Sequence, residues 1–379
     1  MVNFSPNIVF NSSHSPTIGV EVELQTIDSN TFRPIPGSPK LLDFYGETMW
    51  LKKELLDSIV EVNTTICNNV SEVRNDLSKK IRDVIKTSNS MNMDILSMGI
   101  HPLMNWKDAN IAQEERYLSF LDRMQWVLKN FIITGLHVHV GVDSGEKAIA
   151  ITNGLTRYIP HLIAVSASSA FHDGQITGLA STRTKIFEAL PTAGIPHRLL
   201  NFSEFQKYMR TLQRANTIES IREVWWDFRP HIGFGTVEIR ICDSVPTLEE
   251  MVQIAAFSQC LVVALSDHYD SATQLPLLDR WILAENKWRA TRYGLDAEII
   301  VDDSGKQETL KDSFNKLIEI LIPVSIRLGC NKELENLINI VNNNKAPYIR
   351  QLKTFKDSNS LNQVIEESIK ELKESLNEY

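Results

Sequence analysis

The chain has 379 residues, 43% hydrophobic and 23% charged, a composition that is typical of a folded globular protein and excludes a disordered or fibrous one. Its net charge of -8 argues against a broad electrostatic grip on nucleic acid, so we expect no nucleic-acid partner. The four cysteines are widely spaced without a CxxC pair, which indicates neither a zinc knuckle nor a disulfide framework and favours a reducing cytoplasm.

The most apolar stretches of the chain predict buried helices rather than membrane spans. The stretches near 151–170 and 251–265 are interrupted by polar residues such as Asn153, Arg157 and Gln253. The N-terminus, MVNFSPNIVF, has no basic region followed by an apolar run. We therefore expect neither a secretory signal nor a membrane partner.

The first part of the chain predicts strands that alternate irregularly with helices. Strands are indicated where apolar and polar residues alternate, and helices where apolar residues recur every three or four positions. In chain order, the pattern predicts a strand over 17–27, a loop over 28–39, a strand over 58–64, a helix over 68–90, a strand over 95–100, a helix over 114–131 and a strand over 134–142.

The remainder of the chain is mainly helical. The pattern predicts a helix over 144–170 interrupted near Pro160, a functional loop over 173–197, a helix over 201–216, strands over 224–228 and 236–242, a helix from Thr247, and polar helices over 311–328, 332–342 and 360–376. This order predicts an α+β fold with a catalytic domain over 1–305 and a helical extension over 306–379. We expect the extension to pack on the catalytic domain as a cover or as an assembly surface of a homo-oligomer.

Pairs of polar residues spaced by two share one face of a predicted strand. Glu21 and Glu23 point to the same side of their strand, while Val20 and Val22 point to the other. Two neighbouring carboxylates raise each other's pKa unless a cation lies between them, which a divalent metal would provide. Such a pair is also common on an exposed strand face.

Three further segments repeat this spacing. His137 and His139 share a face in GLHVHVGV, and Glu238 and Arg240 share a face in GTVEIRICDS. Taken alone, the histidines could be structural, and the second pair could be a structural ion pair. Glu54 precedes a strand that contains Glu61, and either glutamate alone would suit a surface position.

Together these segments predict acids, imidazoles and an arginine on one face of a sheet. Magnesium prefers carboxylate oxygens, and the histidines would also tolerate manganese. The chain contains neither GxxxxGK[ST] nor GxGxxG, so phosphate binding would depend on metal ions and arginines. The candidates are Arg240 and the loop arginines Arg183, Arg198 and Arg229.

Seven sequence motifs follow one another along most of the chain. They are TIGVEVELQ from Thr17, ELLDSIVEVNT from Glu54, MGIHPL from Met98, GLHVHVGV from Gly135, STRTKIFEALPTAGIP from Ser181, RPHIGFGTVEIRICDS from Arg229 and ENKWRATRYGLDA from Glu285. This combination resembles the type 2 glutamate-cysteine ligase family, the carboxylate-amine ligases of the glutamine-synthetase-like superfamily. The chain departs from the family pattern at Ile232-Gly233-Phe234, a difference that concerns the substrate pocket.

The resemblance implies an antiparallel sheet flanked by helices, which forms a cradle for ATP and magnesium ions. It implies metal ligands at Glu21, Glu23, Glu54, Glu61, His137 and Glu238. His137 would also face the nucleotide, with His139 beside it. Arg240 would contact phosphate and act in catalysis with Glu238 and with Arg183, which lies in the segment that faces the substrate.

The implied reaction activates a carboxylate by phosphoryl transfer from ATP, and an amine then attacks the acyl phosphate to form an amide. Glutamate and cysteine are the pair that the resemblance implies. Two alternatives stay open on the residues: a metal-dependent hydrolase, in which the histidines and glutamates bind an ion that activates water, and a non-catalytic protein that binds ATP or an amino acid.

Overall fold

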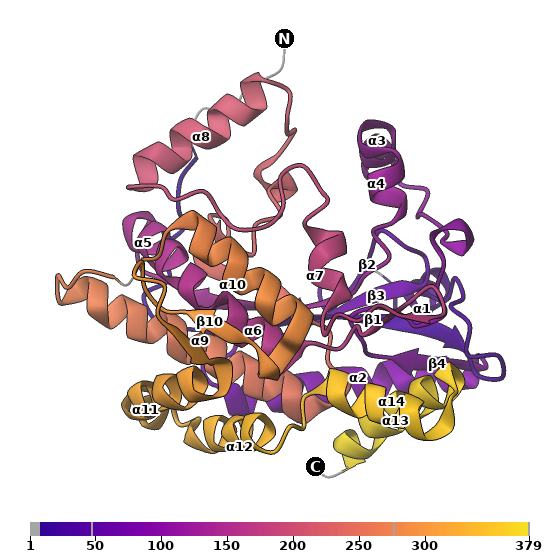
Figure 1. Cartoon of the computed structure of the whole chain (residues 1–379). Helices are drawn as coiled ribbons and strands as arrows, with labels where there is room; N and C mark the ends of the chain where they lie inside the picture. Colours follow the sequence, from indigo (N-terminus) through magenta and orange to yellow (C-terminus); the bar gives the residue numbers. More distant parts are fainter. Residues whose placement is uncertain (1–7, 47, 276, 378–379) are drawn as a thin grey trace.

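The computed structural model of the protein describes residues 8–46, 48–275 and 277–377. Figure 1 shows a sheet at the centre of the molecule, with helices below it, beside it and above it. The first seven residues, on which the expectation about a secretory signal partly rests, lie outside the described residues.

The centre of the fold is a seven-stranded antiparallel sheet, which confirms the predicted α+β class. Its main order is β2-β3-β1-β5-β9-β8, and β4 pairs with the far end of β1. The strands are β1 (Ile18–Asp28), β2 (Leu51–Lys53), β3 (Ile59–Asn63), β4 (Met93–Leu96), β5 (Gly135–Gly141), β8 (Phe228–His231) and β9 (Thr236–Asp243).

One face of the sheet is apolar and covered by helices. Val20, Val22 and Leu24 of β1 are buried on this face, as the alternating pattern predicts. The covering helices include α2, α5, α6 and α9, and Figure 1 shows α2 directly below β1. Their bounds are Val70–Ser90, Gly145–Leu155, Ile159–Ser166 and Leu248–Asp270.

Helix α9 lies at the heart of this core. Among the residues that the structure describes, it is the one helix long and apolar enough to cross a membrane, but 89% of the relevant window is buried inside the fold. Thr247 caps its first turn by accepting the backbone N–H of Glu250, and Glu249 and Glu250 stand at the positive end of the helix dipole. It is therefore a core helix, as predicted.

The opposite face of the sheet carries the polar side chains and is walled by shorter elements. Figure 1 places α3, α4, α7 and α8 above the sheet. Their bounds are Glu115–Met124, Trp126–Lys129, Thr182–Phe187 and Phe202–Arg214. The polar face therefore forms the floor of a space with walls rather than an open surface.

The C-terminal helices are α11 (Leu310–Leu328), α12 (Asn331–Asn342), α13 (Pro347–Ser358) and α14 (Leu361–Asn377). They bury residues such as Phe314, Leu337 and Leu372 in the same hydrophobic cluster as the sheet. Figure 1 shows them below the sheet, on the side away from its polar face.

The structure differs from the expected elements at several places. The strand expected over 224–228 is β8, Phe228–His231, which includes Pro230; an edge strand tolerates proline because one side of its backbone needs no partner. The strand expected over 95–100 is β4, Met93–Leu96. The segment 173–197, expected as a loop, contains α7 and the short strand β7, Gln175–Ile176.

Several elements follow from no pattern identified in the sequence. They are β2, α1 (Ser38–Tyr45) and α13, and two small ribbons formed by β6 (Phe171–His172) with β7 and by β10 (Glu298–Ile300) with β11 (Gln307–Thr309). Helix α10 (Arg280–Tyr293) ends where Gly294 adopts a φ of 56°, the stop that glycine provides.

Candidate active site

The strand register brings the predicted polar residues together on one face. Strands β3, β1, β5 and β9 lie side by side, and each contributes the polar half of its alternating pattern. The Cα partners across these strands are Glu21 with His137, Glu21 with Asn63, Glu23 with Glu61, and His139 with Glu238.

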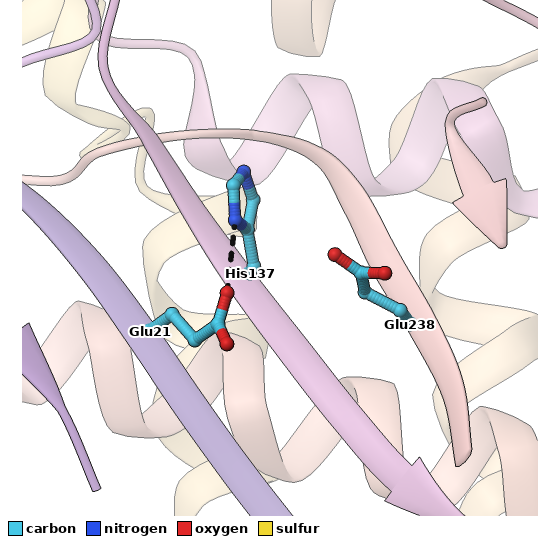
Figure 2. A group of neighbouring side chains, drawn as sticks. All are labelled: Glu21, His137 and Glu238. Carbon is cyan, nitrogen blue, oxygen red and sulfur yellow. Dashed lines mark hydrogen bonds and ion pairs between the residues drawn. The ribbon is translucent and has the colours of Figure 1, made fainter. Parts of the chain in front are cut away.

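The side chains of this row converge. Figure 2 shows Glu21, His137 and Glu238 on three strands, pointing into a common space. Nδ1 of His137 lies 3.4 Å from Oε2 of Glu21, and Nε2 of His139 lies 3.4 Å from Oε1 of Glu21 and 3.8 Å from Oε1 of Glu238. The imidazoles therefore contact the acids directly.

Two overlapping groups of donor atoms have the size of a metal site. Glu21, His137 and Glu238 offer ligand atoms within 4.8 Å of one another, and so do Glu23, Glu61 and His137. His137 is shared by both groups. The two groups are therefore adjacent parts of one site.

The acids at the β2–β3 side of the face are crowded. Burial and the neighbouring Glu23 raise the pKa of Glu54 to about 8. Burial, Glu21 and Glu54 raise the pKa of Glu61 well above its usual range, although the amide of Asn63 donates to its carboxylate at 2.8 Å. A divalent cation between these carboxylates would relieve the repulsion, so the donor set fits a metal ion.

The acids toward β9 are held ionised instead. Burial acts against the charge of Glu21, but His139 and a hydrogen bond from His137 outweigh it and hold its pKa well below its usual range. Burial likewise opposes the charge of Glu238, while Arg229 and Arg240 lower its pKa strongly. The two sides of the face therefore differ. A bound cation would stabilise the carboxylates near β2 and β3, whereas the side near β9 already contains arginines.

Arg229 and Arg240 flank Glu238. Nε of Arg229 donates to Oε2 of Glu238 at 2.8 Å, and Nη1 of Arg240 donates to Oε1. Arg229 also donates to the backbone carbonyls of Arg222 and Val224. This places two cations at the end of the acidic row, where an anionic group would be bound.

Arg183 lies in this site in a way that the sequence did not predict. It is on α7, 2% exposed, and its guanidinium donates to the backbone carbonyls of Arg240 and Ile241 at 3.2 Å. Gly135 permits this approach, because a Cβ there would lie 2.2 Å from Nη2 of Arg183. The loop arginine Arg198, a predicted phosphate contact, lines a separate hollow beside Arg280, so that prediction is wrong.

A hollow of about 380 Å³ lies over the polar face. Its floor contains four of the acids, His137 and the arginines, while Glu238 is buried behind this surface, and the opposite wall is apolar and aromatic. This wall is formed by Tyr117, Phe120, Leu128, Phe131, Phe187, Leu190 and Trp225. The sequence did not indicate these residues, because apolar side chains in helices and loops are more often part of the core.

Comparison with known proteins supplies the family. The model described as "Glutamate-cysteine ligase family 2(GCS2)" matches residues 17–375. A Thermobifida fusca protein named "Putative glutamate--cysteine ligase 2" is 42% identical over 372 residues, which cover 97% of this chain and 93% of that protein. A Frankia casuarinae protein with a similar name is 42% identical over 351 residues, 91% of each chain.

Solved structures share the fold. The crystal structure of a glutamate–cysteine ligase from Francisella tularensis in complex with AMP matches with a TM-score of 0.71 at 12% identity, covering 97% of this chain and 90% of that one. A bifunctional glutathione synthetase from Pasteurella multocida matches with a TM-score of 0.67 at 14% identity, covering 96% of this chain and 52% of that one.

Proposed function

Because the chain belongs to glutamate-cysteine ligase family 2, we propose that it is an ATP-dependent carboxylate-amine ligase that joins glutamate to cysteine or a related amine. The observation that carries this proposal is the convergence of Glu21, Glu61, His137 and Glu238 on one face, with two arginines at its end. Acids for metal ions and arginines for phosphate are what phosphoryl transfer requires.

The metal ligands that we propose come from β1, β3, β5, β9 and the turn after β2. They are Glu21, Glu23, Glu54, Glu61, His137 and Glu238, which offer mainly carboxylate oxygens to magnesium or manganese. A bound divalent ion would bridge phosphate oxygens and neutralise their charge.

Arg240 is the residue that we propose to contact the transferred phosphoryl group. It is placed beside Glu238 at the end of the acidic row, and its Nε is a buried donor without a hydrogen-bond partner. His137 and His139 line the nucleotide side of the same row. Arg183 braces β9 through the carbonyls of Arg240 and Ile241, which makes it a positioning residue.

In the proposed reaction, a carboxylate oxygen of glutamate attacks the γ-phosphorus of ATP, which gives an acyl phosphate and ADP. The amine of the second substrate then attacks the acyl carbon, so that inorganic phosphate leaves and an amide bond forms with loss of a proton. Water would destroy the acyl phosphate, and the aromatic wall of the hollow would exclude it.

The proposal is tested by incubating the protein with ATP, magnesium and panels of amino acids and amines. We expect ADP release that requires both a carboxylate and an amine, and an amide product by mass spectrometry. ATP consumption that is indifferent to the amine would contradict the ligase, and turnover without nucleotide would favour a metal-dependent hydrolase. ATP binding without any turnover would leave a non-catalytic binding protein.

Glu61→Gln tests the metal ligands, with Glu298→Gln as its control because Glu298 is an exposed glutamate of strand β10. We expect Glu61→Gln to need a higher magnesium concentration for half-maximal activity, by roughly 10- to 100-fold, with an unchanged circular dichroism spectrum. An unchanged magnesium requirement would remove Glu61 from the site.

We also propose a cytoplasmic location. The four cysteines are buried free thiols, and Sγ of Cys260 lies 3.6 Å from Sγ of Cys330 without a bond between them, which suits a reducing compartment. The division at residue 305 and the use of the C-terminal helices in a homo-oligomer remain predictions.

A further inference from the structure

The hairpin between β8 and β9 carries two stacked aromatic rings at the rim of the acidic hollow. The rings of His231 and Phe234 have centroids 4.1 Å apart and planes 18° apart, and Phe234 meets His139 edge-on at 5.6 Å. Phe234 lines the hollow and is 63% exposed. An exposed aromatic ring at a binding hollow offers a face for a flat apolar group.

The hairpin is held in place by hydrogen bonds. The N-terminal segment reaches it through Asn11, whose backbone N–H donates to the carbonyl of Ile232 and whose amide donates to the carbonyl of Gly233, both at 2.9 Å. Within the hairpin, the N–H of Phe234 donates to Nδ1 of His231 at 3.2 Å. The stacked rings are therefore preorganised, and a ligand would not have to order them.

The aromatic pair lies next to the cations that would hold phosphate. The register pairs Arg229 with Glu238 and His231 with Thr236, so His231 is two residues along its strand from Arg229, roughly 7 Å. A second hollow, of about 940 Å³, shares Arg229 and His231 with the acidic hollow. A ligand with an anionic tail and a flat head could therefore span from the acidic row to the hairpin.

Two other aromatic rings of the acidic hollow, Phe120 and Phe187, suit this role less well. Phe120 is 5% exposed and Phe187 is 2% exposed, because both pack into hydrophobic clusters of the wall. Their faces are already covered by protein. Phe234 lines the same hollow as Arg229 and Arg240 and is 63% exposed, although one face of its ring stacks on His231.

We infer that the His231–Phe234 pair is the platform on which the purine base of ATP stacks, an inference that rests on the proposed ligase function. The phosphates lie toward Arg229 and Arg240, and the neutral base lies over the hairpin. Phe234 is then a binding residue that determines the affinity for the nucleotide and makes no contact with the reacting atoms.

Phe234→Ala tests the platform, and Phe44→Ala is the matched control, because Phe44 on α1 is also 63% exposed. Loss of base–aromatic stacking should raise the KM for ATP roughly 5- to 150-fold, with kcat and the KM values for both other substrates unchanged. Phe234→Tyr should retain the wild-type KM. Inhibition by magnesium tripolyphosphate, which has no base, should be equal in wild type and Phe234→Ala.

Several results would overturn the platform: an unchanged KM for ATP, a raised KM for the amine or the carboxylate instead, or a change in oligomeric mass, which would make Phe234 a subunit contact. Calorimetric titration with magnesium ATP separates this inference from the ligase proposal because it needs no turnover. Tenfold weaker binding by Phe234→Ala in a protein that forms no amide would support the platform and contradict the ligase. Equal affinities would overturn the platform in an active or an inactive protein.

Discussion

Lys287 of α10 and Asp227, just before β8, form a fully buried ion pair. Nζ of Lys287 lies 2.9 and 2.7 Å from the two carboxylate oxygens of Asp227, and the side chains are 2% and 0% exposed. The same Nζ lies 2.9 Å from Oε1 of Glu188, which follows Phe187 in the wall of the hollow. This pair joins α10 to the wall and to the first residues of the strand that carries Arg229.

Removing one partner of this pair should destabilise the protein strongly. Lys287→Met leaves the carboxylate of Asp227 buried without the cation that contacts it, which should lower the free energy of unfolding by about 3–5 kcal/mol. The double variant Lys287→Met/Asp227→Asn should recover most of the loss. Urea unfolding gives the comparison.

Lys316→Met is the control for this prediction. Lys316 is 65% exposed and pairs with Glu308, so its loss should lower the free energy of unfolding far less than the loss of Lys287. A similar cost for Lys287→Met and Lys316→Met would show that the buried pair contributes no more than a surface pair.

Arg240→Gln should reduce turnover without unfolding the protein. The substitution removes a charged donor at the end of the acidic row, where we propose that phosphate is bound, and removal of one such donor typically lowers kcat by about 100- to 1,000-fold. Arg289→Gln is the control, because Arg289 is an arginine of α10 that pairs with Glu285. Equal kcat values for the two variants would exclude Arg240 from phosphoryl transfer.

His101 should destabilise the protein in acid. Burial lowers the pKa of His101 to about 4, and its Nδ1 accepts the N–H of Leu103 at 3.1 Å, so the ring is neutral in the folded state. His101 binds a proton near pH 6.5 in the unfolded protein but not in the folded protein. Its contribution to the free energy of unfolding is therefore fully present above pH 6.5. It falls by about 1.4 kcal/mol per pH unit between pH 6.5 and 4.

NMR titration of the histidine ring resonances checks this prediction. The resonance of His101 should stay unchanged from pH 8 to pH 5. A midpoint near 6.5 would contradict the neutral buried ring and remove this contribution to acid unfolding.

Gly235 should be essential to the β8–β9 hairpin. It has a φ of +67°, and a Cβ at this position would lie 1.6 Å from the carbonyl oxygen of Asn11. Gly305 has a φ of +81° with open space around it, so Gly305→Ala should cost only the backbone strain, about 1–2 kcal/mol. Gly235→Ala should cost clearly more, as measured by thermal unfolding, because the hairpin or the N-terminal segment must also move. Equal losses would show that the segment around Asn11 yields freely.

The alternation of polar and apolar residues is a local property, and it was enough to predict many residues of the site. The spacing of two in Glu21 and Glu23, and in His137 and His139, places each pair on one face of its own strand whatever the neighbouring strands are. Helix α2 follows in the same way from its periodicity, and α9 follows from its long apolar stretch after Thr247. The sequence motifs also indicated the family, which the comparisons confirm.

The order and register of the strands decided the rest. Strand pairing joins residues far apart in the chain, and a shift of one residue would turn every side chain to the other face, so no local pattern specifies that Glu21 faces His137. Contacts made across the fold also turned Arg183 onto the carbonyls of β9, placed Arg198 in another hollow and exposed Phe234 at the rim. Local periodicity determined which face each polar side chain takes, and tertiary packing determined which of these side chains meet.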